Sequence, residues 1–223
     1  KIKMSKVLYL TIFVALAGIF LYNYNNENKG NEDVLLLNDI KIISYDETVE
    51  KHLLRFKEAI GNDYEGYRGH IYRVLTYSIH FLHGNEEKRS IIASALVFHD
   101  IGLWTDGTLA YLEPSTSRAE EYFNQKTLKG DDRQLLKDII YWHHKITPFK
   151  GSNEDIVNAV IKADLIDASS GLFTKGMPRS HIKKVNDAIP EAGFHKTLIE
   201  FGPRLHGWNI VKIIVDMSSI LKW

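Results

Sequence analysis

The sequence contains no cysteine among its 223 residues. Disulfide bonds, thiolate metal ligands and cysteine nucleophiles are therefore excluded, although this absence does not fix the redox compartment. Neither sign of charge predominates, because 28 lysines and arginines balance 28 aspartates and glutamates. By charge alone, neither a nucleic-acid polymer nor an acidic membrane surface is expected as the main partner. There is also no glycine-rich phosphate loop and no internal repeat.

The longest apolar run, residues 7–22, contains no charged side chain and follows Lys1, Lys3 and Lys6. A full membrane crossing needs about 20 residues, so the run is slightly short. We expect an uncleaved signal anchor or transmembrane segment over residues 1–22, with a cleaved signal peptide and a buried globular helix as alternatives. Lysines ahead of the run favour a cytoplasmic N-terminus, which places the rest of the chain on the extracytoplasmic side. Residues 23–46 are expected to be a linker.

The remaining chain, residues 47–223, has the apolar spacing of helices and few prolines between them. Helices are expected near 47–60, 64–83, 87–101, 115–127, 131–144, 153–170, 180–188 and 194–219, the last interrupted near Pro203 and Gly207. Residues 35–45 could hold a short strand or an extended segment. The predicted fold class is all-α, with one domain behind the N-terminal apolar segment.

One histidine falls on a helix face that should be buried. His70 lies four residues before Val74, on the stripe that also carries Tyr77 and Phe81. A lone histidine in such a position is more often a hydrogen-bonded core residue than a ligand.

A second histidine and a carboxylate end a wholly apolar helix. His99 and Asp100 directly follow residues 91–98, in which Ser94 alone is polar. A histidine at a helix C-terminus complements the helix dipole, but a carboxylate is disfavoured there. A nearby cation would remove this objection.

Two more helices contribute inward-facing polar groups. Asp164 lies on the apolar face of helix 153–170, where it could instead pair with a buried lysine or arginine, and Asp167 is the second choice for any role of Asp164. His143 shares a face with apolar residues of helix 131–144, and His144 lies at the edge of that face, although paired histidines are also common on surfaces. A divalent cation would offset the burial of all these groups together. Nitrogen and oxygen ligands of this kind suit Zn, Mn, Fe, Co or Ni better than Ca.

In this order, the residues resemble the HD-domain superfamily of metal-dependent phosphohydrolases. The family pattern H…HD…D is matched by His70, by the pair His99 and Asp100, and by Asp164, within residues 50–170. Arg73 matches an arginine often found one turn after the first histidine. The resemblance implies an HD-domain helical bundle with a C-terminal helical extension. It also implies one divalent metal ion and hydrolysis of a small phosphorylated substrate, such as a nucleotide, by metal-activated water.

The chain departs from the two-metal members of that superfamily, which carry a further histidine before the paired histidines. Residues 111–123 contain no histidine. The chain therefore resembles the single-metal branch, which includes nucleotidases and cyanamide-hydratase-like lyases. A lyase or hydratase acting on a nitrile-like molecule, a two-iron oxygenase and a non-catalytic scaffold are the alternatives. The expected metal ligands are His70, His99, Asp100, Asp164 and His143, and the expected catalytic residues are Asp106 or His144 as general acid and Arg73 as a phosphate contact.

Overall fold

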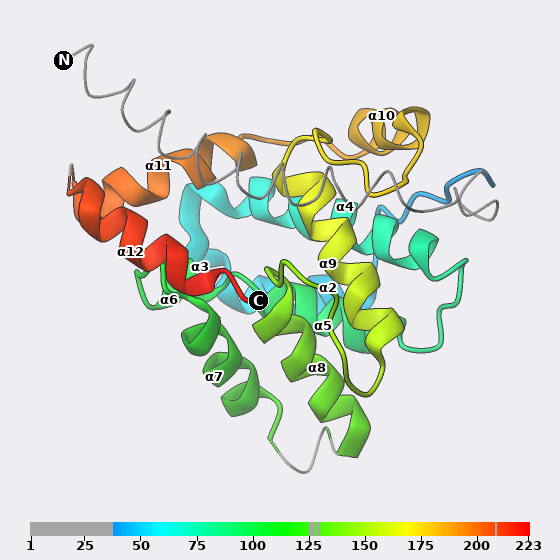
Figure 1. Cartoon of the computed structure of the whole chain (residues 1–223), viewed down its shortest axis with the longest axis horizontal. Coiled ribbons are helices and arrows are strands. Elements are labelled where there is room, and N and C mark those ends of the chain that lie inside the picture. The colour runs from blue at the N-terminus through cyan, green and yellow to red at the C-terminus, as the bar shows by residue number, and fades with distance from the viewer. Residues whose placement is uncertain (1–37, 125–127, 129, 208) are drawn as a thin grey trace.

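The computed structural model describes residues 38–124, 128, 130–207 and 209–223. Throughout these residues the regular elements are helices, without a strand (Figure 1), which confirms the all-α prediction. None of the helices in this part of the chain is long and apolar enough to cross a membrane. The predicted anchor, residues 7–22, lies outside the described residues.

The helices follow the sequence prediction closely. They are α2 (Glu47–Leu53), η2 (Leu54–Phe56), α3 (Lys57–Ile60), η3 (Gly61–Asp63), α4 (Tyr64–Phe81), α5 (Arg89–Phe98), α6 (Gly102–Thr105), α7 (Leu112–Tyr122), α8 (Gly130–Trp142), α9 (Glu154–Ala168), α10 (Arg179–Ala188), α11 (Phe194–His206) and α12 (Ile210–Ile220). The interruption expected near Pro203 and Gly207 occurs at Gly207, whose φ of 58° suits glycine. Pro203 remains inside the last turn of α11.

The packed domain begins earlier than residue 47, so the predicted linker 23–46 extends too far. Ile40 and Ile43 are only 1% and 4% exposed. The backbone N–H of Ile43 donates to Thr76 Oγ1 on α4. Asp46 caps α2 by accepting from the N–H groups of Thr48 and Val49. Residues 40–46 therefore form an extended segment that packs on α4, one of the two forms expected for this stretch.

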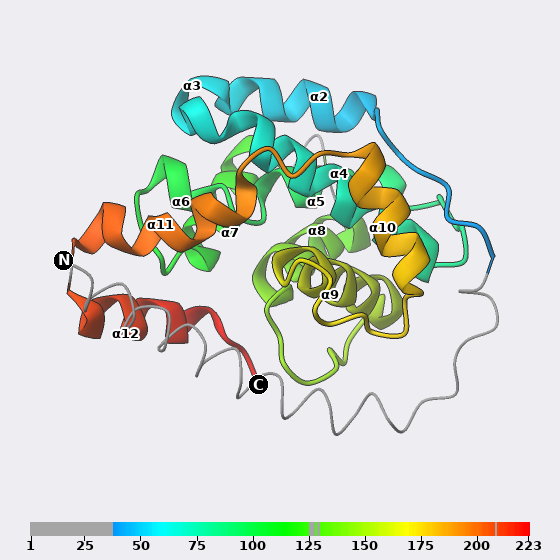
Figure 2. The same cartoon turned by 90° about the horizontal axis from the view of Figure 1, so that it is seen from above.

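The main core lies between the long helices. Helix α4 packs along α9, and α5 packs against α8, α2 and α4 (Figure 2). Helix α5 is buried because it is apolar on all sides. This position carries the residues that follow α5 into the centre of the domain.

A second, smaller core holds the C-terminal extension. Its members include Leu103, Tyr111, Phe201, Ile213 and Ile220. They join α6 and the start of α7 to the helices α11 and α12, which lie side by side at one end of the molecule (Figure 1). The extension is therefore fixed to the domain beside Tyr111.

A buried histidine outside the predicted set of metal ligands should make the fold sensitive to acid. His52 contacts the Tyr122 hydroxyl through Nδ1 at 2.8 Å and packs edge-on against Phe123. Burial, with help from Lys51 and Arg55, lowers the pKa of His52 from 6.5 to about 4. His52 of the unfolded chain therefore binds a proton below pH 6.5, whereas His52 of the folded protein binds one only below about pH 4. The free energy of unfolding falls as the pH is lowered through that interval.

We expect His52 to account for about 1 kcal/mol of the stability lost between pH 7 and pH 5, a value reduced for partial solvent screening. Chemical unfolding at both pH values should show this loss for the wild type and a smaller loss for His52→Gln. Equal losses in the two proteins would assign the acid sensitivity to other groups.

Candidate metal centre

Four helical segments bring histidine and aspartate side chains to one buried point. His70 lies in the middle of α4, His99 and Asp100 follow α5, His143 follows α8, and Asp164 lies in α9. These five residues are between 0% and 4% exposed. Ionisable groups buried to this degree need partners or a metal ion.

The atoms that face one another have the spacing of ligands around one ion. His70 Nε2 and His99 Nε2 are 3.0 Å apart. Asp164 Oδ1 lies 3.3 Å from His70 Nε2, and Asp100 Oδ2 lies 3.2 Å from His99 Nε2. Metal–ligand bonds of about 2.0–2.2 Å place neighbouring ligand atoms about 3.0–3.5 Å apart. The observed separations fit that requirement.

The hydrogen bonds of the histidines leave their inner nitrogens available to a metal. His99 Nδ1 donates to the Leu96 carbonyl at 2.6 Å, and His143 Nδ1 donates to the Ile140 carbonyl at 2.7 Å. His70 Nδ1 donates to Asp167 Oδ2 at 2.7 Å. In each neutral ring Nε2 then carries a lone pair. The lone pairs of His70 and His99 face each other, an arrangement that a cation or a proton must relieve.

Two further atoms point to a cation. Among the described residues, neither Asp100 Oδ1 nor His143 Nε2 has a hydrogen-bond partner, although both atoms are buried. They lie 3.3 Å apart. Buried polar atoms without partners are rare in native proteins, and an ion between them would satisfy both.

The donor atoms form two overlapping groups. One ligand atom each from His70, His99 and Asp100 lies within 4.8 Å of the others, and the same holds for Asp100, His143 and His144. Asp100 belongs to both groups. These residues could hold a metal ion, as the sequence predicted for four of them. Asp164 belongs to neither group by this spacing but lies beside the two imidazoles described above.

The pKa shifts of the cluster residues also indicate that a positive charge is stabilised at this point. Burial opposes ionisation of Asp100, but His99 and His143 hold the pKa of its carboxyl well below the usual range. Asp164 has a lowered pKa because His70 and His99 likewise outweigh burial. Burial alone would lower the pKa of His99, yet Asp100 and Asp164 raise it to about 10. In the metal-free protein, a proton on His99 therefore supplies part of the charge that a metal ion would bring.

Behind the cluster, Arg73 positions Asp167. Arg73 Nε and Nη2 donate to the two carboxylate oxygens of Asp167 at 2.6 and 2.9 Å, and Nη1 donates to the Pro190 carbonyl. Arg73 is 1% exposed. Protein groups thus engage each nitrogen of the guanidinium, and the contact of Arg73 with a substrate phosphate stays a prediction. Asp167, the second choice for a ligand, instead fixes the orientation of His70.

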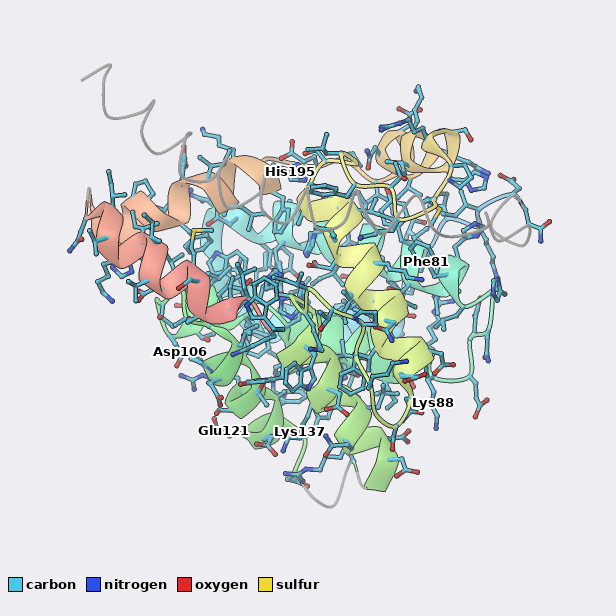
Figure 3. The ribbon with its side chains drawn as sticks, in the orientation of Figure 1. Phe81, Lys88, Asp106, Glu121, Lys137 and His195 are labelled. Carbon is cyan, nitrogen blue, oxygen red and sulfur yellow. The ribbon has the colours of Figure 1, made fainter. Side chains whose placement is uncertain are left out.

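The two predicted general acids differ in position. Asp106 is exposed and lies at the edge of the molecule beside α6 and α7 (Figure 3). It pairs with Arg118 at 3.1 Å, and although burial opposes this, Arg118 and Thr105 lower the pKa of its carboxyl. Asp106 is thus an ion-paired surface group outside both groups of candidate ligands, and the structure gives no support to its prediction as the acid.

His144 does lie at the cluster. Its Nδ1 is 3.8 Å from Asp164 Oδ2, and its Nε2 is 2.5 Å from the Tyr111 hydroxyl. Burial and the neighbouring His143 lower the pKa of His144 to about 3, so the ring is neutral. Burial raises the pKa of Tyr111, so its hydroxyl stays protonated and donates a hydrogen bond to His144 Nε2. Tyr111 was not predicted, because its contact with His144 joins residues 33 positions apart and no local pattern marks it.

Gly69 of α4 packs closely against Pro190, in the segment that joins α10 to α11. A methyl group at Gly69 should disturb this contact. A Cβ on Gly69 would lie 2.7 Å from the Pro190 carbonyl oxygen and 3.0 Å from Arg73 Nη1. Alanine gains about 1 kcal/mol of helix propensity, but overlap with a backbone atom costs about 1–3 kcal/mol. We expect Gly69→Ala to destabilise the protein by about 1 kcal/mol on balance and to weaken metal binding. Chemical unfolding measures the change in stability, and metal titration measures the change in affinity. A stabilised variant would show that the backbone at Pro190 shifts to accommodate the methyl group without cost.

Comparisons with family models, curated proteins and solved structures gave no match. A function is therefore inferred from the cluster and from the order of its residues along the chain.

Proposed function

We propose that this protein is a metal-dependent hydrolase of the HD-domain type, which cleaves a phosphate ester of a small molecule such as a nucleotide. The observation that carries the proposal is the buried cluster of His70, His99, Asp100 and Asp164, whose inner atoms lie 3.0–3.8 Å apart in the pairs formed with the two imidazoles. These residues would hold one divalent ion, with Zn, Mn, Fe, Co and Ni as the candidates.

When bound, such an ion acts as a Lewis acid and lowers the pKa of a coordinated water to about 7. The protein's part is to hold the ligands in place. Asp167 and the Leu96 carbonyl each fix one imidazole so that its Nε2 faces inward. The nearly complete burial of the ligands excludes bulk water, which strengthens every charge interaction at the centre.

We assign the substrate side of the centre to His144 and Tyr111. Among the residues of the cluster, His144 has the most exposed side chain, at 23%. It therefore links the buried ligands to solvent. The neutral ring accepts a hydrogen bond from Tyr111 at Nε2, which orients its other nitrogen toward Asp164. A substrate that enters from solvent meets this pair before it reaches Asp100.

We propose further that residues 7–22 anchor the domain to a membrane as a signal anchor, with the domain on the extracytoplasmic side. The support is the apolar run with preceding lysines.

The test is elemental analysis of the purified chain, followed by an activity panel with each metal added back. We expect close to one equivalent of a transition metal and release of phosphate from nucleoside monophosphates, an aryl phosphate or an aryl phosphodiester, with activity lost in chelator. Hydration of cyanamide without phosphate release would replace the proposal with a lyase. Two equivalents of iron would indicate an oxygenase, and metal without any turnover would indicate a scaffold.

A further inference from the structure

Helix α12 presents an apolar face that the described residues leave uncovered. Val211, Ile214 and Val215 follow one another at i, i+3 and i+4, so they form one stripe. They are 72%, 42% and 58% exposed. The opposite side of the helix places Ile213 and Ile220 in the second core, where they are 4% and 8% exposed.

The helix is not apolar all round, because Lys212 and Asp216 pair at 3.0 Å on the flank between the stripe and the buried side. The three aliphatic side chains of the stripe itself are nevertheless open to solvent among the described residues. A contiguous apolar stripe on a surface marks a contact with another protein or a membrane. Met217, 37% exposed, lies between this stripe and the buried side of the helix, and the stripe is followed one turn later by Ser218 and Ser219. Since α12 is anchored on one side only, its outer side has the character of a docking surface.

The size of the stripe argues against a stable dimer. An 11-residue helix is about 16 Å long and about 10 Å wide, whereas a standard interface buries about 800 Å² on each partner. A face of this size is well below that requirement. It is sufficient for a helix that lies in the plane of a membrane interface, where a few aliphatic side chains enter the acyl boundary.

The N-terminal part of the chain supplies a reason for that contact. Given the signal anchor proposed above, the 15 residues from 23 to 37 connect the anchor to the described domain and span at most about 50 Å. The domain is then held close to the bilayer, and a weak apolar contact is favoured by the high effective concentration. We propose that the exposed face of α12, made by Val211, Ile214 and Val215, lies on the lipid bilayer. This inference rests on the proposed membrane anchor.

The docking would bring the substrate side of the centre near the membrane. The residues after α12 pair with the segment that follows α8, since the Ile146 N–H donates to the Lys222 carbonyl at 2.7 Å. The Lys222 N–H also lies 3.5 Å from the His144 carbonyl. Trp223, 75% exposed, is of the residue type enriched at membrane interfaces. The three side chains of the stripe are aliphatic and uncharged, so the contact should form on neutral lipid.

The absence of cysteine allows a direct test with single spin labels on the full chain, reconstituted in phosphatidylcholine vesicles. Val215→Cys reports the α12 face, and Leu172→Cys is the matched control, because Leu172 is 59% exposed after α9. Val14→Cys reports the anchor. We expect the label at position 215 to be accessible to oxygen and protected from a water-soluble nickel chelate, and the label at position 172 to stay accessible to nickel. Each variant must retain the metal content and helical spectrum of the unlabelled protein.

The outcomes separate the inference from the anchor. If the label at position 14 is within the bilayer but that at position 215 is open to nickel, the docking is wrong and the anchor stands. If the label at position 14 is outside the bilayer, both the proposed anchor and the docking of α12 are wrong. Protection of position 215 from oxygen as well as nickel would show that protein, such as residues 7–22, covers the face. Spin–spin broadening that disappears on dilution with unlabelled protein would show a second copy. Either result overturns the inference.

Discussion

Asp100→Ala is expected to remove the metal ion and abolish activity. Asp100 Oδ2 lies 3.2 Å from His99 Nε2 and its Oδ1 lies 3.3 Å from His143 Nε2, so one carboxylate serves both groups of candidate ligands. Loss of the several kcal/mol of charge stabilisation that a bound metal supplies corresponds to more than about a thousandfold in rate. Metal content by elemental analysis and phosphate release on the best substrate of the panel measure the two losses. Asp100→Asn, which keeps the side-chain volume, should lose activity to the same extent.

Asp106→Ala is the matched control for this substitution. It removes the same group from the same stretch of chain, but Asp106 is exposed and paired with Arg118. An exposed pair of this kind contributes about 0–1 kcal/mol, and metal content and activity should stay at the wild-type level. If Asp106→Ala is inactive, or if Asp100→Ala keeps its metal and its activity, the buried cluster is not the reacting centre.

The burial of the cluster side chains could be predicted from sequence, because helical periodicity is a local property. The stripe through Val74 and Tyr77 places His70 on the buried face of α4, and the structure brings it 3.0 Å from His99. The apolar character of α5 predicted that His99 would lie deep in the domain, where it is 0% exposed. Both inferences needed only neighbours within two turns.

The partners of Arg73 and the position of Asp106 could not be predicted in the same way. Arg73 and Asp167 are 94 residues apart, and their pairing depends on how α4 packs along α9. Asp106 is close to Asp100 in sequence, but the short helix α6 intervenes and ends with Asp106 at the surface. Tyr111 reaches His144 through a contact between the start of α7 and the end of α8. Periodicity fixes which face of a helix is buried but not which residues meet across two helices.

Arg73→Met should destabilise the metal-free protein by about 3–5 kcal/mol, because it leaves an unpaired charge in the interior. Asp167 is 3% exposed, and Arg73 donates to both of its carboxylate oxygens. Methionine keeps much of the apolar stem but provides no donor. The freed carboxylate also holds His70 less firmly, so metal affinity should fall about 10–100-fold, as for other residues that orient a ligand. Chemical unfolding in chelator gives the first effect, and competition with a chromophoric chelator gives the second.

The double variant Arg73→Met with Asp167→Leu, whose new side chain cannot accept a hydrogen bond from His70, separates these two roles. It removes the buried charge together with its partner, so stability should recover by most of the loss seen in the single variant. Metal affinity should remain low, because the carboxylate that accepts from His70 Nδ1 at 2.7 Å is gone. If Arg73→Met costs no more than an exposed pair, about 1 kcal/mol, then Asp167 does not depend on Arg73 for its charge. If the double variant recovers affinity along with stability, the orientation of His70 is set by the packing of its ring, which stacks on Phe194 with centroids 4.1 Å apart, rather than by Asp167.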